Sequence, residues 1–135
     1  MKLIERDFYL DKLKNVMGTP DIKVITGVRR CGKSKLMDAF IDWIKKNKKD
    51  ANIIHINYNL FEFDSIKTAH ALDSYVEERY QINKTNFLLI DEVQLCTDFE
   101  KVINSFHARD KYDIYITGSN AFLLSSDLAT LFTGR

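Results

Sequence analysis

The chain has 135 residues, of which 45% are apolar and 29% charged, which is enough material for one compact core and a polar surface. Its formal net charge of +1 gives no global field for nucleic acid or membrane, so neither is indicated as a partner. Only two cysteines, Cys31 and Cys96, are present, and the first residues lack the apolar core of a signal peptide. These features exclude a disulfide framework and a zinc site, and favour the reducing cytoplasm.

Apolar spacing predicts a lead-in helix over about residues 5–17, which Gly18 and Pro20 should end. A short apolar strand at 22–26 follows. The next helix, beginning near residue 33, has one apolar face and an opposite face of charged residues. Its apolar face consists of Leu36, Phe40, Trp43 and Ile44.

Strands and helices alternate along the rest of the chain. Ser65 is expected to cap a helix that runs to about Tyr80, and a helix around Phe99–Phe106 precedes the last strand. The further strands are expected at residues 52–58, 86–91 and 112–117. This alternation predicts an α/β fold with a parallel sheet and helices on both faces, as three layers.

The stretch from Gly27 to Ser34 fits the pattern G-x-x-x-x-G-K-S between the first strand and a helix, which is the form of a phosphate-binding loop. Glycines let backbone N–H groups converge on phosphate oxygens, and the helix adds its positive end. Lys33 would contact the β- and γ-phosphates of ATP, and the Ser34 hydroxyl would bind Mg²⁺. The alternative is a glycine-rich turn. The expected nucleotide-binding residues are Gly27, Val28, Arg29, Arg30, Cys31, Gly32, Lys33, Ser34 and Lys35.

Polar residues follow two other predicted strands, and ligands gather at the carboxyl ends of parallel strands. Asp91 and Glu92 have the form of a Walker B element, in which the first carboxylate helps hold Mg²⁺ and the second polarises the attacking water. The alternative is a pair that caps the next helix. Residues 117–120 could contact the γ-phosphate or form a turn with an N-cap, and the sequence leaves both open.

Three segments, GVRRCGKS, FLLIDEVQ and YITGSNAFLLSSDLATLFTGR, resemble a prokaryotic family of AAA-type P-loop ATPases. The resemblance assigns Asp91 to the magnesium-binding aspartate and Glu92 to the catalytic glutamate. Asn120 resembles the polar sensor after the fourth strand. Arg135 is similar to the family's arginine at that place, which contacts phosphate in cis or from a neighbouring subunit.

The resemblance also implies parts beyond residue 135, because family members usually have a fifth strand, a helical lid and a C-terminal region related to restriction endonucleases. Residues 1–135 are therefore expected to form a single truncated ATPase domain. The strand at 22–26 should then lie at an edge of the sheet, where residues 1–6 or a second copy of the chain in a homo-oligomer would cover it.

The expected function is Mg²⁺-dependent binding and hydrolysis of ATP, mainly by positioning and charge neutralisation. One alternative is a nucleotide-binding module without useful turnover, whose bound state controls a partner protein or the C-terminal region. Another is a folded remnant without function.

Overall fold

The computed structural model describes residues 2–25, 32–119 and 132–133. Within these ranges five strands form one parallel sheet in the order β2-β3-β4-β1-β5. The strands are β1 (Lys23–Ile25), β2 (Ala51–Asn57), β3 (Thr85–Asp91), β4 (Asp113–Thr117) and β5 (Phe132–Thr133). The α/β class and the four strands expected from the sequence are confirmed.

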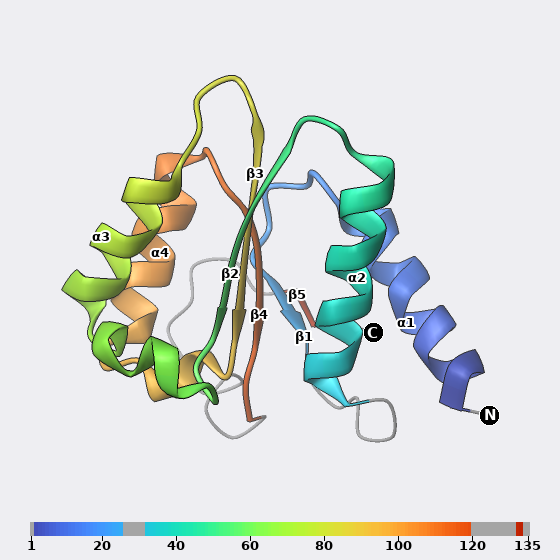
Figure 1. Cartoon of the computed structure of the whole chain (residues 1–135), viewed down its shortest axis with the longest axis horizontal. Coiled ribbons are helices and arrows are strands. Elements are labelled where there is room, and N and C mark those ends of the chain that lie inside the picture. The colour runs from blue at the N-terminus through green and yellow to red at the C-terminus, as the bar shows by residue number, and fades with distance from the viewer. Residues whose placement is uncertain (1, 26–31, 120–131, 134–135) are drawn as a thin grey trace.

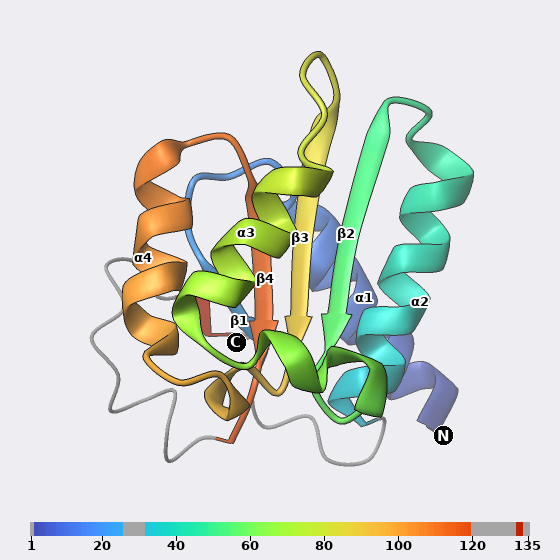
Figure 2. The same cartoon turned by 60° about the vertical axis from the view of Figure 1, so that its left-hand side comes forward.

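Helices cover both faces of the sheet, so the fold has three layers (Figure 1). On one face lie α1 (Lys2–Val16) and α2 (Lys33–Asn47), and on the other α3 (Ala69–Arg79) and α4 (Phe99–Arg109), as the turned view in Figure 2 also shows. Each face has its own apolar cluster, one packed under α2 and one under α3 and α4. The central strands β3 and β4 are consequently buried almost throughout, which explains their nearly continuous apolar sequence.

The first strand is not an edge, which corrects the expectation that a fifth strand is lacking. β1 pairs with β4 on one side and with β5 on the other, where Lys23 is in register with Phe132 and Val24 with Thr133. The two residues of β5 are enough to cover β1, because β1 itself has only three residues. Their pairing gives hydrogen-bond partners to the backbone groups of β1 that face away from β4. Neither residues 1–6 nor a second copy of the chain is needed to cover it.

The segment expected to form one helix over 65–80 is divided in two. Residues Phe61–Ile66 form a 3₁₀ helix, η1, whose Phe63 is buried in the core. Thr68 then interrupts the helical path with extended backbone, and its Oγ1 accepts the N–H of Ala71 at 3.3 Å. The cap of α3 is therefore Thr68 and not Ser65, because Ser65 belongs to the separate turn η1, which buries Phe63.

A buried ion pair fixes the amino-terminal edge of the sheet. Lys23, fully buried in β1, places its Nζ 2.6 Å from Asp113 Oδ1 of β4 and donates to the carbonyl of Thr19 at 2.7 Å. The Nζ–Oδ1 contact is close but lacks the alignment of a hydrogen bond. Asp113 Oδ2 accepts the Gly18 N–H and the Tyr115 hydroxyl, each at 2.9 Å. These contacts join the α1–β1 turn to two strands of the sheet.

None of the helices in the described part of the chain has the length and apolar composition needed to span a bilayer.

We expect the Asp113→Asn variant to lose about 3 kcal/mol of unfolding free energy, because it leaves the Lys23 ammonium buried beside a neutral amide. Urea unfolding followed by circular dichroism measures this loss. The double variant Lys23→Met, Asp113→Asn removes both charges, so it should lose less than the sum of the losses of Lys23→Met and Asp113→Asn. Parent-like stability of Asp113→Asn would contradict the role given to this ion pair.

Candidate functional site

The carboxyl ends of β3 and β4 bring two buried polar side chains together. Ile90 is in register with Ile116, so Asp91 and Thr117 stand at neighbouring strand ends. Thr117 Oγ1 donates to Asp91 Oδ1 and accepts the backbone N–H of Glu92 at 3.0 Å. Both side chains are almost inaccessible, Asp91 at 1% and Thr117 at 0%. One hydroxyl therefore fixes the aspartate side chain and the backbone of the next residue.

Glu92 turns the chain sharply out of β3. Its backbone is left-handed, with φ 59° and ψ 52°, and it precedes the short 3₁₀ helix η2 (Val93–Leu95). A non-glycine residue rarely adopts this conformation, and here it ends the strand and redirects the chain into η2. The Glu92 side chain is partly exposed, and its Oε1 accepts a hydrogen bond from Gln94 Nε2 at 2.7 Å. The carboxylate is thus oriented at the open edge of the sheet.

The helix α2 begins at this same edge (Figure 1). Gly32 is its N-cap residue, with φ 74° and ψ 133°, and the Gly32 carbonyl accepts the N–H of Leu36 at 3.1 Å. The φ of Gly32 is positive, a backbone conformation that glycine adopts without strain, and its role toward phosphate stays a prediction. Lys33 and Ser34 occupy the first turn of α2, and both are partly buried. The free N–H groups of the first turn and the dipole of α2 favour an anion here.

Several predicted site residues lie outside the described part of the chain. They are Gly27, Val28, Arg29, Arg30, Cys31, Asn120 and Arg135. Their assignments remain predictions. Those that the structure does describe are Gly32, Lys33, Ser34, Lys35, Asp91 and Glu92, and all of them lie at the carboxyl edge of the sheet or at the start of α2.

His55 is a neighbour of this site that the sequence did not single out. It lies on β2, and Asn57, two residues later on the same face, is in register with Asp91. The pKa of His55 is lowered, because burial disfavours the charged ring. The carboxylates of Asp38 and Asp91 act in the opposite direction but have the smaller effect. Among the described residues, none forms a hydrogen bond with its buried Nε2. His55 therefore lies on the face of the sheet that α2 covers, which is also the face that carries Asp91.

Two further residues of the site were missed or only partly predicted. Thr117 was expected to face phosphate or to take part in a turn, but its hydroxyl contacts Asp91 and Glu92. Gln94 was not considered, although its place two residues after a carboxylate that follows a strand was visible in FLLIDEVQ. A side chain two residues further along can contact the Glu92 carboxylate only if the backbone turns at Glu92. The sequence did not reveal that turn.

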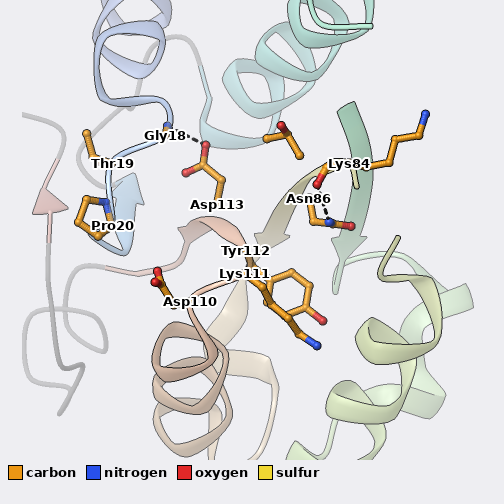
Figure 3. Close-up of a pocket in the computed structure, with 10 residues that line it drawn as sticks. Gly18, Thr19, Pro20, Lys84, Asn86, Asp110, Lys111, Tyr112 and Asp113 are labelled. Atoms are coloured by element: carbon orange, nitrogen blue, oxygen red, sulfur yellow. Dashed lines mark hydrogen bonds between the residues drawn. The ribbon is translucent and has the colours of Figure 1, made fainter. Parts of the chain in front are cut away.

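A pocket lies at the opposite edge of the sheet. Figure 3 shows this pocket of about 270 Å³, with Gly18, Asn86 and Asp113 in its wall. The Asn86 side chain is bonded at both ends, accepting from Asn52 and Gln81 and donating to the carbonyls of Gln81 and Lys84. Asp113 is bound by Lys23, Gly18 and Tyr115. Since these polar groups already have partners, we assign this pocket to the packing of the sheet edge.

The arrangement is that of a nucleotide-binding domain of the ATPase type, with a helix N-terminus and buried strand-end acid at one edge of a parallel sheet. Residues 19–135 match the family described as AAA domain, and the chain belongs to this family. The resemblance noted in the sequence is therefore confirmed.

Relatives are found in both bacteria and archaea. An uncharacterized protein of Haemophilus influenzae is 38% identical over 98% of this chain, and an uncharacterized protein of Methanocaldococcus jannaschii is 32% identical over 99%. These matches cover 34% and 28% of the relatives, so the chain spans about a third of their length.

The solved structure of PCH-2 from C. elegans has the same fold. It superposes with a TM-score of 0.54 at 16% sequence identity, over 98% of this chain and 41% of that chain. At this identity the similarity supports the architecture alone.

We expect Thr117→Val to lower the free energy of unfolding by about 2 kcal/mol, because valine keeps the volume but leaves the Glu92 N–H and Asp91 Oδ1 without their buried partner. Urea denaturation measures the difference. Thr117→Ser is the matched control, since it keeps the hydroxyl and loses only a methyl group, so its loss should be smaller. A Val variant as stable as the Ser variant would contradict the importance of these hydrogen bonds.

Proposed function

We propose that the protein binds Mg²⁺-ATP at the carboxyl edge of its sheet and hydrolyses the γ-phosphate. The observation that carries this proposal is the arrangement of Asp91 and Glu92, held by Thr117 at the edge where α2 begins. A helix dipole that favours phosphate and a carboxylate pair at the same edge of the sheet are two of the elements that phosphoryl transfer to water uses.

The residues present fit a magnesium ion. Mg²⁺ prefers oxygen ligands and usually keeps several waters, with one or two protein ligands and the phosphates completing its shell. Asp91 and the Ser34 hydroxyl would supply those oxygens, and a larger acidic cluster is not required. When bound, the ion would neutralise charge on the phosphates during transfer.

In the proposed reaction, Lys33 and the first N–H groups of α2 hold the phosphates, while Glu92 orients a water molecule. The water oxygen forms a bond to the γ-phosphorus, and one of its protons passes to the Glu92 carboxylate. The bond between the γ-phosphorus and the bridging oxygen breaks, and its electron pair remains on ADP. Glu92 then returns the proton to phosphate or solvent, so the products are ADP and inorganic phosphate.

A second candidate is a nucleotide-binding module without turnover, whose bound state controls a partner or another part of a longer protein. The observation that favours it is that the chain spans only about a third of its curated relatives. Measuring Mg²⁺-ATP affinity and phosphate release on the same sample separates the two. Binding with release supports the enzyme, binding without release supports the module, and absence of both contradicts each of them.

We expect Lys33→Ala to weaken ATP binding at least about tenfold, because it removes a charged donor directed at phosphate. The fold should be unaffected, since Lys33 has no other assigned role. Isothermal titration with Mg²⁺-ATP measures the affinity. Lys46→Ala, at the exposed far end of the same helix, is the control and should bind as the parent does. Equal affinity of Lys33→Ala and Lys46→Ala would remove Lys33 from the site.

We expect Glu92→Gln to keep the ATP affinity and to slow phosphate release about 100-fold or more, because an amide cannot accept the proton of the water. Single-turnover release of phosphate, measured alongside binding, separates the two effects. Glu62→Gln neutralises an exposed carboxylate of η1 and should release phosphate at the parent rate. Parent-like turnover by Glu92→Gln would eliminate this residue as the base.

A further inference from the structure

Gln94 is bound at one end only. Its Nε2 donates to Glu92 Oε1 at 2.7 Å. Its own Oε1 is buried and has no hydrogen-bond partner among the described residues. An ionised carboxylate only accepts hydrogen bonds, so the amide nitrogen has to face Glu92 and the amide oxygen has to face away from it. The unpaired atom is therefore a consequence of the contact with Glu92.

This arrangement is unfavourable for stability alone. A buried acceptor without a partner destabilises the folded state, whereas an apolar side chain of the same size would leave nothing unpaired. Buried polar groups that lack a partner in a native structure call for an explanation, such as a catalytic role or a bound water. The amide of Gln94 stands beside the carboxylate that the proposed reaction uses, which makes a role in that reaction the simplest explanation.

Two restraints together define the direction of the Glu92 carboxylate. Thr117 holds the backbone N–H of Glu92 at 3.0 Å, and Gln94 holds Oε1 at 2.7 Å. In the part of the chain that the structure describes, Glu92 Oε2 has no hydrogen-bond partner. One carboxylate oxygen is thus fixed and the other remains available to a water molecule. A flexible glutamate side chain would otherwise sample several rotamers at this open edge.

We propose that Gln94 is a positioning residue for the hydrolysis proposed above, on which this inference rests. The Nε2 of Gln94 fixes Glu92 Oε1, so that Glu92 Oε2 faces the attacking water. The buried Oε1 of Gln94 accepts a hydrogen bond from a water molecule that is present when Mg²⁺-ATP occupies the site. Gln94 transfers no proton itself. It acts through Glu92 by reducing the number of orientations that the base can adopt.

The test is a double-mutant cycle between these two residues. Gln94→Leu keeps the approximate size of the side chain and should lower kcat about tenfold, with the KM for ATP unchanged and a melting temperature no lower than the parent's, because it removes the unpaired acceptor. In the Glu92→Gln background, where there is no base to orient, the same substitution should change the residual rate by less than about twofold. Gln94→Glu, which places a second carboxylate beside the first, should also lower kcat.

Gln81→Leu is the matched control, because Gln81 is exposed and precedes β3 at the opposite edge of the sheet. It should keep the parent kcat. Hydrolysis by Gln94→Leu at the parent rate would overturn the role of Gln94 and leave the proposed hydrolysis standing. The same conclusion would follow if Gln94→Leu lowered kcat by the same factor in the parent and in the Glu92→Gln background, since a merely structural residue would behave in that way. A parent protein that binds Mg²⁺-ATP but releases no phosphate would overturn the proposed hydrolysis, and the role of Gln94 with it.

Discussion

The pairing of β3 with β4 determines where the site can form. Because Ile90 is in register with Ile116, the next residues of the two strands, Asp91 and Thr117, meet at the carboxyl edge. A shift of the pairing by one residue would point one of these side chains to the opposite face of the sheet. Burial on both faces of these strands fixes the register, since every side chain after Thr85 in β3 and every side chain of β4 is buried.

The two edges of the sheet use the same residue type in opposite ways. Asp113, at the beginning of β4, is neutralised by Lys23 and bonded by Gly18 and Tyr115. Asp91, at the end of β3, is bonded by a single hydroxyl, with no cation beside it among the described residues. A buried carboxylate without a counter-ion is unfavourable unless a cation arrives. The amino-terminal edge therefore has its counter-ion within the described residues, whereas the carboxyl edge has none there, which is compatible with the magnesium ion that we propose.

The sequence predicted the class of fold, four of the strands, the turn of the chain at Gly32 and the placing of Asp91 and Glu92 at a strand end. These features follow from short-range patterns, namely continuous apolar runs and glycine before a helix. The strand β5 was missed because a pair of residues, Phe132–Thr133, has no periodicity, and only its pairing with β1 defines it. The division at Thr68 was missed because it depends on where Phe63 finds a buried place, which is a tertiary effect.

The buried polar atoms without hydrogen bonds give independent support to the location of the site. Among the described residues these atoms are His55 Nε2, Gln94 Oε1 and Asp113 Oδ1. Asp113 Oδ1 has the ammonium of Lys23 at 2.6 Å, so its charge is neutralised. Of the other two, His55 lies on the neighbouring strand β2, in register with Leu89, and Gln94 lies in the turn that follows Glu92. Native folds leave few such atoms unpaired, and water or a ligand commonly supplies the missing partner. Two of the three atoms thus belong to residues near the end of β3, where the proposed chemistry would bring water, and the third belongs to the ion pair at the opposite edge.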